Sequence, residues 1–238
     1  MSYVARVDRA HEPVSLDDFF RLSPLNGAHR HGMWRALQSR RWQALLDLLD
    51  AFQWRDPETW SHCERVQHYA LDLAGKLKMS SGEMHSLRLA SLVHDIGKMA
   101  VSDNILHKQS PLTHDEYSTI RLHAEIGERL IHPLIPHPDV LAGIRHHHER
   151  MDGEGYPDRL IGQQIPLHAR IIAVADVFDA LTHVRPYRRN LLTPLEALEV
   201  LEAQTQGQLD PDLVFQFSQM IRSTLETVVE VPSLKQSF

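Results

Sequence analysis

The sequence predicts an all-helical fold. Apolar residues recur at steps of three and four along most of the chain, which is the spacing of amphipathic helices. The prolines fall between these apolar stripes or at first-turn positions, and no segment shows the alternation typical of a half-buried strand. These observations favour a single helical bundle that is preceded by a short helical extension.

The predicted helices follow one another in order. The first is amphipathic and covers Trp34 to Phe52; we expect it to pack on the domain, with a dimer contact or a partner contact as alternatives. The next apolar stripes fall at residues 66–77, 84–93, 120–130, 141–147, 171–181, 195–201 and 213–225. Thr193, Pro194 and Glu196 form the start of a helix with a capping box.

The length of 238 residues suits one sizeable domain with a short appendage. We expect an N-terminal extension with an amphipathic helix over residues 1–54, the main domain over residues 55–228, and a C-terminal tail over residues 229–238. The sequence contains no internal repeat and no recognisable sensor domain, so the source of any regulation is open.

The composition narrows the classes of function. The net charge of −6 argues against a nucleic-acid polymer as partner, because such proteins usually carry a basic surface. No apolar run approaches the roughly 20 residues that span a bilayer, the N-terminus lacks the apolar core of a secretory signal, and Cys63 is the single cysteine. We therefore expect a cytoplasmic protein without a membrane partner. The 17 histidines are several times the usual number for such a chain, and they suggest metal binding.

An ionisable pair stands at the end of an apolar predicted helix, where burial without a partner would be costly. The pair is His94 and Asp95 in the segment LVHDIGK; together they can hold one divalent ion, while the second carboxylate oxygen reaches another. An isolated pair of this kind is more often a helix-end histidine beside a solvated aspartate. Further residues of ligand type on or at the ends of predicted helices favour the metal interpretation, namely His123, His146, His147, His148, Asp176 and Asp179.

Glu58 and His62 stand four residues apart on the predicted helix after Pro57, so their side chains share one face. This spacing is typical of two ligands to one ion. The alternative is an acid favoured by the helix dipole beside a surface histidine. We interpret His62 as a ligand, whereas both interpretations stay open for Glu58.

The ordered motifs resemble the HD-GYP domain family. They are His62, the segment HDIGK from His94, His123, the segment HHHERMDGEGYP from His146, and the segment DVFDALTHVRPYR from Asp176. The resemblance covers residues 56 to 225. It implies the helical bundle of the HD superfamily and hydrolysis of cyclic di-GMP to linear pGpG, with further hydrolysis to GMP and the preference over a mixed guanine-adenine analogue left open.

The resemblance also implies a ligand set. One metal ion would be held by His62, His94, Asp95 and Asp176, and a second by Asp95, His123, His147 and His148, so that Asp95 bridges the two. Some family members hold a third ion with a glutamate at the position of Glu58. We therefore expect two or three divalent metal ions, with iron or manganese favoured.

The expected chemistry is hydrolysis by a metal-activated hydroxide, because two neighbouring ions lower the pKa of a bridging water and stabilise both the attacking and the leaving oxygen. Asp95 and Lys98 are the expected catalytic residues, since the Lys98 ammonium would lie near a phosphate bound at the metal. By resemblance, Lys98, Tyr156 and Arg185 would contact the nucleotide, although Tyr156 and Arg185 could each be structural.

One residue departs from the family pattern, and one catalytic role has two candidates. His183 stands where the family more often has a small hydroxyl residue, close to Arg185. The proton donor to the leaving oxygen is open between a metal-bound water and Asp179.

Three functions from different classes fit these motifs. The first is a phosphodiesterase with a cyclic dinucleotide as substrate. The second is an HD-type phosphohydrolase that acts on another nucleotide or phosphoester, and the third is a weakly active module that binds cyclic di-GMP or docks onto a cyclase domain. The complete ligand set and the intact GYP and RPYR segments favour the first. A homodimer is a further partner to test.

Overall fold

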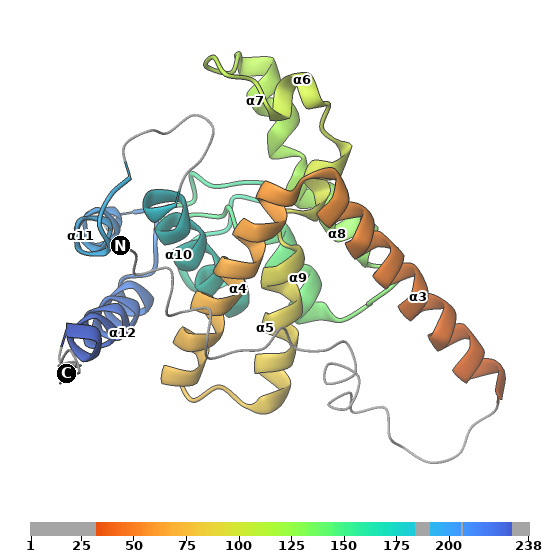
Figure 1. The fold of residues 1–238 in the computed structure, drawn as a ribbon, viewed down its shortest axis with the longest axis horizontal. Helices are drawn as coiled ribbons and strands as arrows, with labels where there is room; N and C mark the ends of the chain where they lie inside the picture. Colours follow the sequence, from red (N-terminus) through yellow and green to blue (C-terminus); the bar gives the residue numbers. More distant parts are fainter. Residues whose placement is uncertain (1–31, 184–190, 206, 230–238) are drawn as a thin grey trace, which may run out of the picture. The chain divides into compact units, whose positions relative to one another are not determined.

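The computed structural model describes residues 32–183, 191–205 and 207–229, and this part of the chain contains helices and connecting segments but no strand (Figure 1). The predicted all-helical class is therefore confirmed. The chain divides into two compact units, Met1–Arg40 and Arg41–Phe238. The second unit carries every residue discussed below.

The described helices follow most of the predicted stripes, but the stripe over residues 120–130 crosses a break between two helices at Leu122. In chain order they are α3 (Gly32–Arg55), α4 (Pro57–Lys76), α5 (Ser81–Val93), η1 (Ile96–Ala100), α6 (Asp103–Leu106), α7 (His114–Arg121), α8 (His123–Ile131), α9 (Pro138–His146), η2 (Gly162–Gln164), α10 (Leu167–Thr182), α11 (Pro194–Gln204) and α12 (Pro211–Val229).

The second unit begins inside α3, earlier than the expected boundary at residue 55. Leu45 and Phe52 of this helix are buried, and the ring of Phe52 meets the edge of Trp60 in α4 at 5.8 Å between centroids. The C-terminal half of α3 is thus part of the hydrophobic core, as its apolar stripe predicts.

The core of the unit is a bundle around α4, α5, α9 and α10. Helix α4 packs against α5 and α10, α9 packs against both α5 and α10, and α8 packs against η1 and α9. The fully buried side chains that fill the spaces between them include Val66, Leu73, Leu87, Ala90, Ile144, Ile171, Ile172 and Phe178. This packing brings one end of α5, α8 and α9 to the middle of α4 and α10.

The helix starts are set by local sequence. Asp56 accepts a hydrogen bond from the backbone N–H of Thr59 and is followed by Pro57 in the first turn of α4. Capping boxes begin α5 at Ser80 and α11 at Thr193, the latter as predicted. These caps satisfy backbone donors that the helices themselves leave unpaired.

Helices α6 and α7 stand apart from the bundle (Figure 1). The main packing contacts of helix α7 are with its neighbours α6 and α8, and none of its residues is buried. Its last residue, Arg121, nevertheless reaches the site described below. Among the described helices, none is both long and apolar enough to cross a membrane.

Candidate metal centre

The imidazoles of the site stand where helices begin or end. His94 follows α5, His123 opens α8, and His147 follows α9, whereas His62 lies within α4 and Asp176 within α10. Because these elements pack on one another, residues from five segments of the sequence meet at one place. The convergence of ligand-type residues that the sequence predicts is therefore present.

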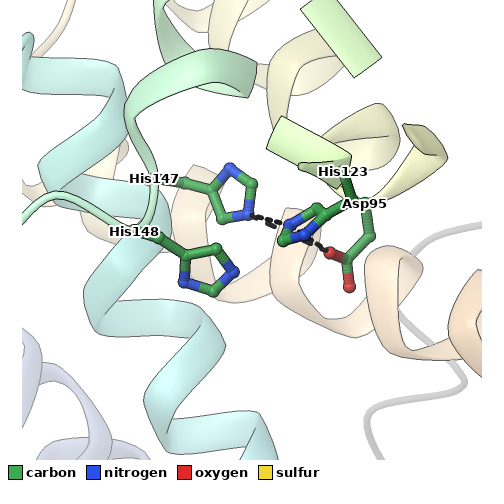
Figure 2. Close-up of side chains that lie close together, drawn as sticks. All are labelled: Asp95, His123, His147 and His148. Carbon is green, nitrogen blue, oxygen red and sulfur yellow. Dashed lines mark hydrogen bonds and ion pairs between the residues drawn. The ribbon is translucent and has the colours of Figure 1, made fainter. Parts of the chain in front are cut away.

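Two groups of side chains can each surround an ion. Within each group the ligand atoms lie within 4.8 Å of one another, and the groups are Asp95, His123, His147 and His148 (Figure 2), and His62, His94 and Asp176. Asp95 lies between them: its Oδ1 is 3.2 Å from Nε2 of His123, and its Oδ2 is 3.8 Å from Nε2 of His62. This carboxylate is placed to bridge two ions.

One hydrogen bond fixes the direction of each helix-end imidazole. Nδ1 of His94 lies 2.7 Å from the carbonyl oxygen of Ser91, and Nδ1 of His123 and of His147 make the same contact, also at 2.7 Å, with the carbonyl three residues earlier. A carbonyl oxygen can only accept, so Nδ1 must carry the proton. In the neutral ring, Nε2 then presents a lone pair towards the centre, which is the form that binds a metal.

The rings on the His123 side are neutral at ordinary pH. Burial lowers the pKa of His123 to about 4 and that of His148 to about 3, and it lowers the pKa of His147 well below its ordinary value. Burial likewise lowers the pKa of His94. These imidazoles therefore hold no positive charge that would compete with a metal cation.

The carboxylate and His62 behave differently. Burial by itself would raise the pKa of Asp95, but the charge of Lys98 and the nearby imidazoles bring it well below its ordinary value, so Asp95 stays ionised. For His62, burial disfavours the charged form, yet hydrogen bonds to Asp176 and Asp179 outweigh it and raise the pKa. The centre thus offers the neutral imidazoles of His94, His123, His147 and His148 beside the ionised carboxylate of Asp95.

The donor set fits a divalent metal. Nε2 of His123 and Nε2 of His147 lie only 3.2 Å apart, so two lone pairs face each other when both rings are neutral. In addition, Nε2 of His94 and Oδ1 of Asp95 are buried and make no hydrogen bond. Buried polar atoms without partners are costly. Two bound cations, one in each ligand group, would satisfy these four atoms.

A second layer of charged side chains lies behind His62. Oδ2 of Asp179 lies 2.6 Å from Nδ1 of His62, and Arg65 donates to both Asp179 oxygens at 2.7 and 3.0 Å. Nδ1 of His183 also lies 3.0 Å from Asp179. Burial opposes ionisation of this carboxyl, but His183, His62 and Arg65 hold its pKa far below the ordinary range.

This second layer bears on the proton donor, which the sequence leaves open between a metal-bound water and Asp179. The Asp179 carboxylate is already engaged with His62 and Arg65, and its lowered pKa argues against a proton on it. It instead fixes the ring orientation of His62. Arg65 is not among the residues predicted from the sequence: its position three residues after His62 places both on one helix face, but its partner Asp179 lies on another element.

Two residues expected to contact substrate border the centre. Lys98 donates to Oδ2 of Asp95. The ring of Tyr156 stacks on His148 with 4.9 Å between centroids and an interplanar angle of 29°. Both line a pocket of about 430 Å³ together with His123, His147, His148 and Asp176. The described residues therefore place an open cavity directly beside the ligand groups.

The segment that carries Tyr156 is held by two acids. The Glu149 carboxylate accepts from the backbone N–H groups of Asp158 at 2.6 Å and Leu160 at 3.0 Å. The Asp158 carboxylate accepts from Arg145 at 2.7 and 2.8 Å and lies 2.9 Å from Nε2 of His146. His146 is thus used to anchor this loop, in keeping with its absence from the expected ligand set.

Three further residues, Glu58, Arg185 and Cys63, are not part of the two ligand groups. Glu58 is exposed and belongs to neither ligand group, and Arg185 lies outside the described residues. The sulfur of the buried Cys63 lies within 4.8 Å of ligand atoms of His94 and Asp95. Burial raises the pKa of its thiol well above the ordinary value, so it stays protonated and is a poor ligand.

Residues 48–213 match the HD domain family, and the chain belongs to this family. Its motifs and its relatives place it in the HD-GYP group, as the resemblance predicted.

Two sequence relatives and one solved structure illustrate the match. The chain is 40% identical over 181 residues to the cyclic di-GMP phosphodiesterase response regulator RpfG of Xanthomonas campestris, an alignment that covers 75% of this chain and 47% of the relative. It is 38% identical over 159 residues to 3'3'-cGAMP-specific phosphodiesterase 3 of Vibrio cholerae, covering 66% and 34%. The HD domain of the L. monocytogenes phosphodiesterase PgpH, solved with cyclic-di-AMP, superposes with a TM-score of 0.58 at 16% identity, covering 79% and 99%. The chain thus spans less than half the length of both sequence relatives.

Proposed function

We propose that this chain is a metal-dependent phosphodiesterase that hydrolyses a cyclic dinucleotide, with cyclic di-GMP as the first substrate to test. The observation that carries the proposal is the convergence of imidazoles and carboxylates in two ligand groups beside a pocket. The names of the relatives support the substrate class, because they act on cyclic di-GMP or on 3'3'-cGAMP.

We assign the ligands as follows. One ion is held by His62, His94, Asp95 and Asp176, and the other by Asp95, His123, His147 and His148. The two ligand groups and the position of Asp95 between them support this assignment. A third ion held by Glu58 has less support, because this side chain is exposed and lies outside both groups. Mixed imidazole and carboxylate ligation is compatible with iron, manganese, zinc, cobalt or nickel, and we favour iron or manganese on the family resemblance.

When bound, the ions would activate water and neutralise charge on the scissile phosphate. The chain supplies the rest. Lys98, held by Asp95, presents its ammonium to the phosphate from the wall of the pocket. Tyr156 lines the pocket beside His148 and is proposed to pack against the nucleotide. Arg185 is proposed as a further substrate contact on the strength of its motif alone.

The test is hydrolysis by purified protein that is reconstituted without oxygen with iron(II) or manganese(II). We expect linear pGpG from cyclic di-GMP, and loss of at least about a hundredfold of the rate in His94→Ala and Asp95→Ala. His114→Ala is the matched control, because this α7 histidine has a side chain that is 94% exposed and lies outside both ligand groups.

Two other results would contradict the proposal in different ways. Cleavage of generic phosphodiesters without cleavage of any cyclic dinucleotide would favour an HD-type phosphohydrolase with another substrate. Tight binding of cyclic di-GMP without product would favour a signalling module. We also propose a cytoplasmic location, supported by the single cysteine.

A further inference from the structure

The pocket beside the metal centre contains three described cationic side chains, and two of them have acidic partners. Lys98 donates to Asp95, and Arg150 donates to both oxygens of Asp152 at 3.0 and 2.6 Å. The third, Arg121, makes no hydrogen bond and no ion pair in the described part of the chain. Its guanidinium is therefore the cation in this pocket wall whose donors are not already used.

The guanidinium of Arg121 is held in place by aromatic rings instead of an acid. Its Cζ lies 4.3 Å from the ring centroid of Tyr156 and 5.9 Å from that of Tyr117. Stacking on an aromatic face leaves the planar edge of a guanidinium open, and that edge carries the N–H donors. Arg121 is thus oriented, and its hydrogen-bonding capacity is available to a ligand.

The position of Arg121 separates it from the catalytic cation. The ring of Tyr156 contacts both His148, at 4.9 Å between centroids, and Arg121. Lys98, in contrast, lies directly on the bridging Asp95. A ligand that reaches from the metal centre past Tyr156 would meet Lys98 beside Asp95 and Arg121 beside Tyr156.

We propose that Arg121 is a substrate-binding residue that contacts the second, non-scissile phosphate of the cyclic dinucleotide. This inference rests on the proposed function. The two phosphodiesters of a cyclic dinucleotide lie on opposite sides of its macrocycle, so one faces away when the other is at the metals. A planar guanidinium can bind that phosphate with two parallel hydrogen bonds. The arrangement explains why an exposed helix, α7, carries a well-oriented arginine at its end.

The experiment compares two ligands on the reconstituted holoenzyme. Cyclic di-GMP has two phosphodiesters, whereas the linear dinucleotide GpG has the same two bases and a single phosphodiester. KM and kcat are measured for cyclic di-GMP, and the inhibition constant of GpG is measured in competition with it. The variants are Arg121→Gln, Arg121→Lys, and the control Arg129→Gln on α8, whose arginine side chain is 74% exposed and outside the pocket.

For Arg121→Gln we expect KM for cyclic di-GMP to rise by about tenfold or more, the range for a hydrogen bond to a charged group, with a smaller change in kcat. The inhibition constant of GpG should change much less. The preference of the variant for cyclic di-GMP over GpG should therefore be smaller than that of the wild type. For Arg121→Lys we expect a KM for cyclic di-GMP between those of the wild type and Arg121→Gln, because lysine keeps the charge but loses the planar pair of donors. Arg129→Gln should match the wild type.

Two outcomes would overturn the inference. An equal loss of affinity for cyclic di-GMP and GpG would mean that Arg121 contacts a base. Unchanged affinity for both would mean that Arg121 does not contact the substrate. Metal content and circular dichroism of each variant, equal to those of the wild type, ensure that a loss is not a folding defect. If the wild type itself neither binds nor cleaves cyclic di-GMP, the proposed function has failed, and not the assignment of Arg121.

Discussion

His62 differs from the helix-end histidines in the group that holds its ring. His94, His123 and His147 each contact a backbone carbonyl through Nδ1, whereas His62 contacts the Asp179 carboxylate, which Arg65 holds in turn. A carboxylate partner makes an imidazole a stronger ligand than a carbonyl does. At the scale of single residues, Asp179 is therefore the side chain outside the ligand set that most affects one ion.

Asp179→Asn should weaken metal binding by about 10- to 100-fold, the usual effect of losing a partner of this kind, because the amide no longer holds His62 with a full charge. The measurement is competition with a chelator of known affinity. Asp115→Asn on α7 serves as the control, since this carboxylate is fully exposed and lies outside the centre. An affinity equal to that of the wild type would show that Asp179 does not orient the ligand.

At the scale of elements, the contact between η1 and α8 depends on a glycine. A Cβ on Gly97 would overlap the carbonyl oxygen of His123 and the backbone nitrogen of Gly127. Backbone atoms cannot move aside as a flexible side chain can. The close approach of η1 to α8 sets the distance between Asp95 and His123, so it also sets the geometry of one ligand group.

Gly97→Ala should destabilise the protein by about 1–3 kcal/mol or more, as overpacking does, and should lower its metal content. The free energy of unfolding from denaturant titration and the metal content are the measurements. Gly75→Ala is the matched control: nothing lies within 4 Å of a Cβ at this position near the end of α4, so stability should stay equal or rise by about 0.4–1 kcal/mol. Equal stabilities for the two variants would contradict this account.

The loop that carries Tyr156 gives a prediction for pH. Hydrogen bonds from Arg145 lower the pKa of Asp158 to about 2, with a smaller effect of His146. Because the folded pKa lies below the ordinary one, this contact stabilises the loop above the ordinary value of 3.8 and is lost as the pH falls towards 2.

Arg145→Gln should move the pKa of Asp158 up towards its ordinary value, which carboxyl chemical shifts in an NMR titration would report. The matched variant is Arg159→Gln, an exposed arginine next to Asp158 that takes no part in the contact, and it should leave the pKa low. An unchanged pKa in Arg145→Gln would assign the shift to another cause.

At the scale of the whole molecule, the proposed metal centre takes its ligands from most helices of the bundle. The proposed ligands come from α4, α8, α10 and the segments that follow α5 and α9. The unfolded chain does not hold these side chains together, so the metal ion binds to the folded state and not to the unfolded state. Binding should therefore stabilise the entire unit and not one loop.

Removal of the metal by a chelator should lower the midpoint of thermal unfolding. At a free metal concentration about a hundred times the Kd, the contribution of one site is about 2.7 kcal/mol. Calorimetry with and without manganese(II) is the measurement, and His94→Ala should have lost most of this difference. The same midpoint with and without metal in the wild type would refute the proposed centre.

The sequence predicted the helices well because their apolar stripes and caps are local signals, as at Thr193. The meeting of His94, His123 and His147 followed from the family resemblance and not from spacing, since segments far apart along the chain meet only through helix packing. Arg65 and Arg121 could not be assigned for the same reason: each takes its role from a side chain on another element, Asp179 or Tyr156.

The bonds that aim His94, His123 and His147 also have a consequence for how this chain can vary. Each one fills a carbonyl at a helix end, where the helix itself supplies no donor. One inserted residue within α5 would rotate everything after it by about 100° around the helix axis and carry His94 away from its neighbours. Insertions and deletions inside these helices should therefore disrupt the centre, and length changes should be confined to the connecting loops.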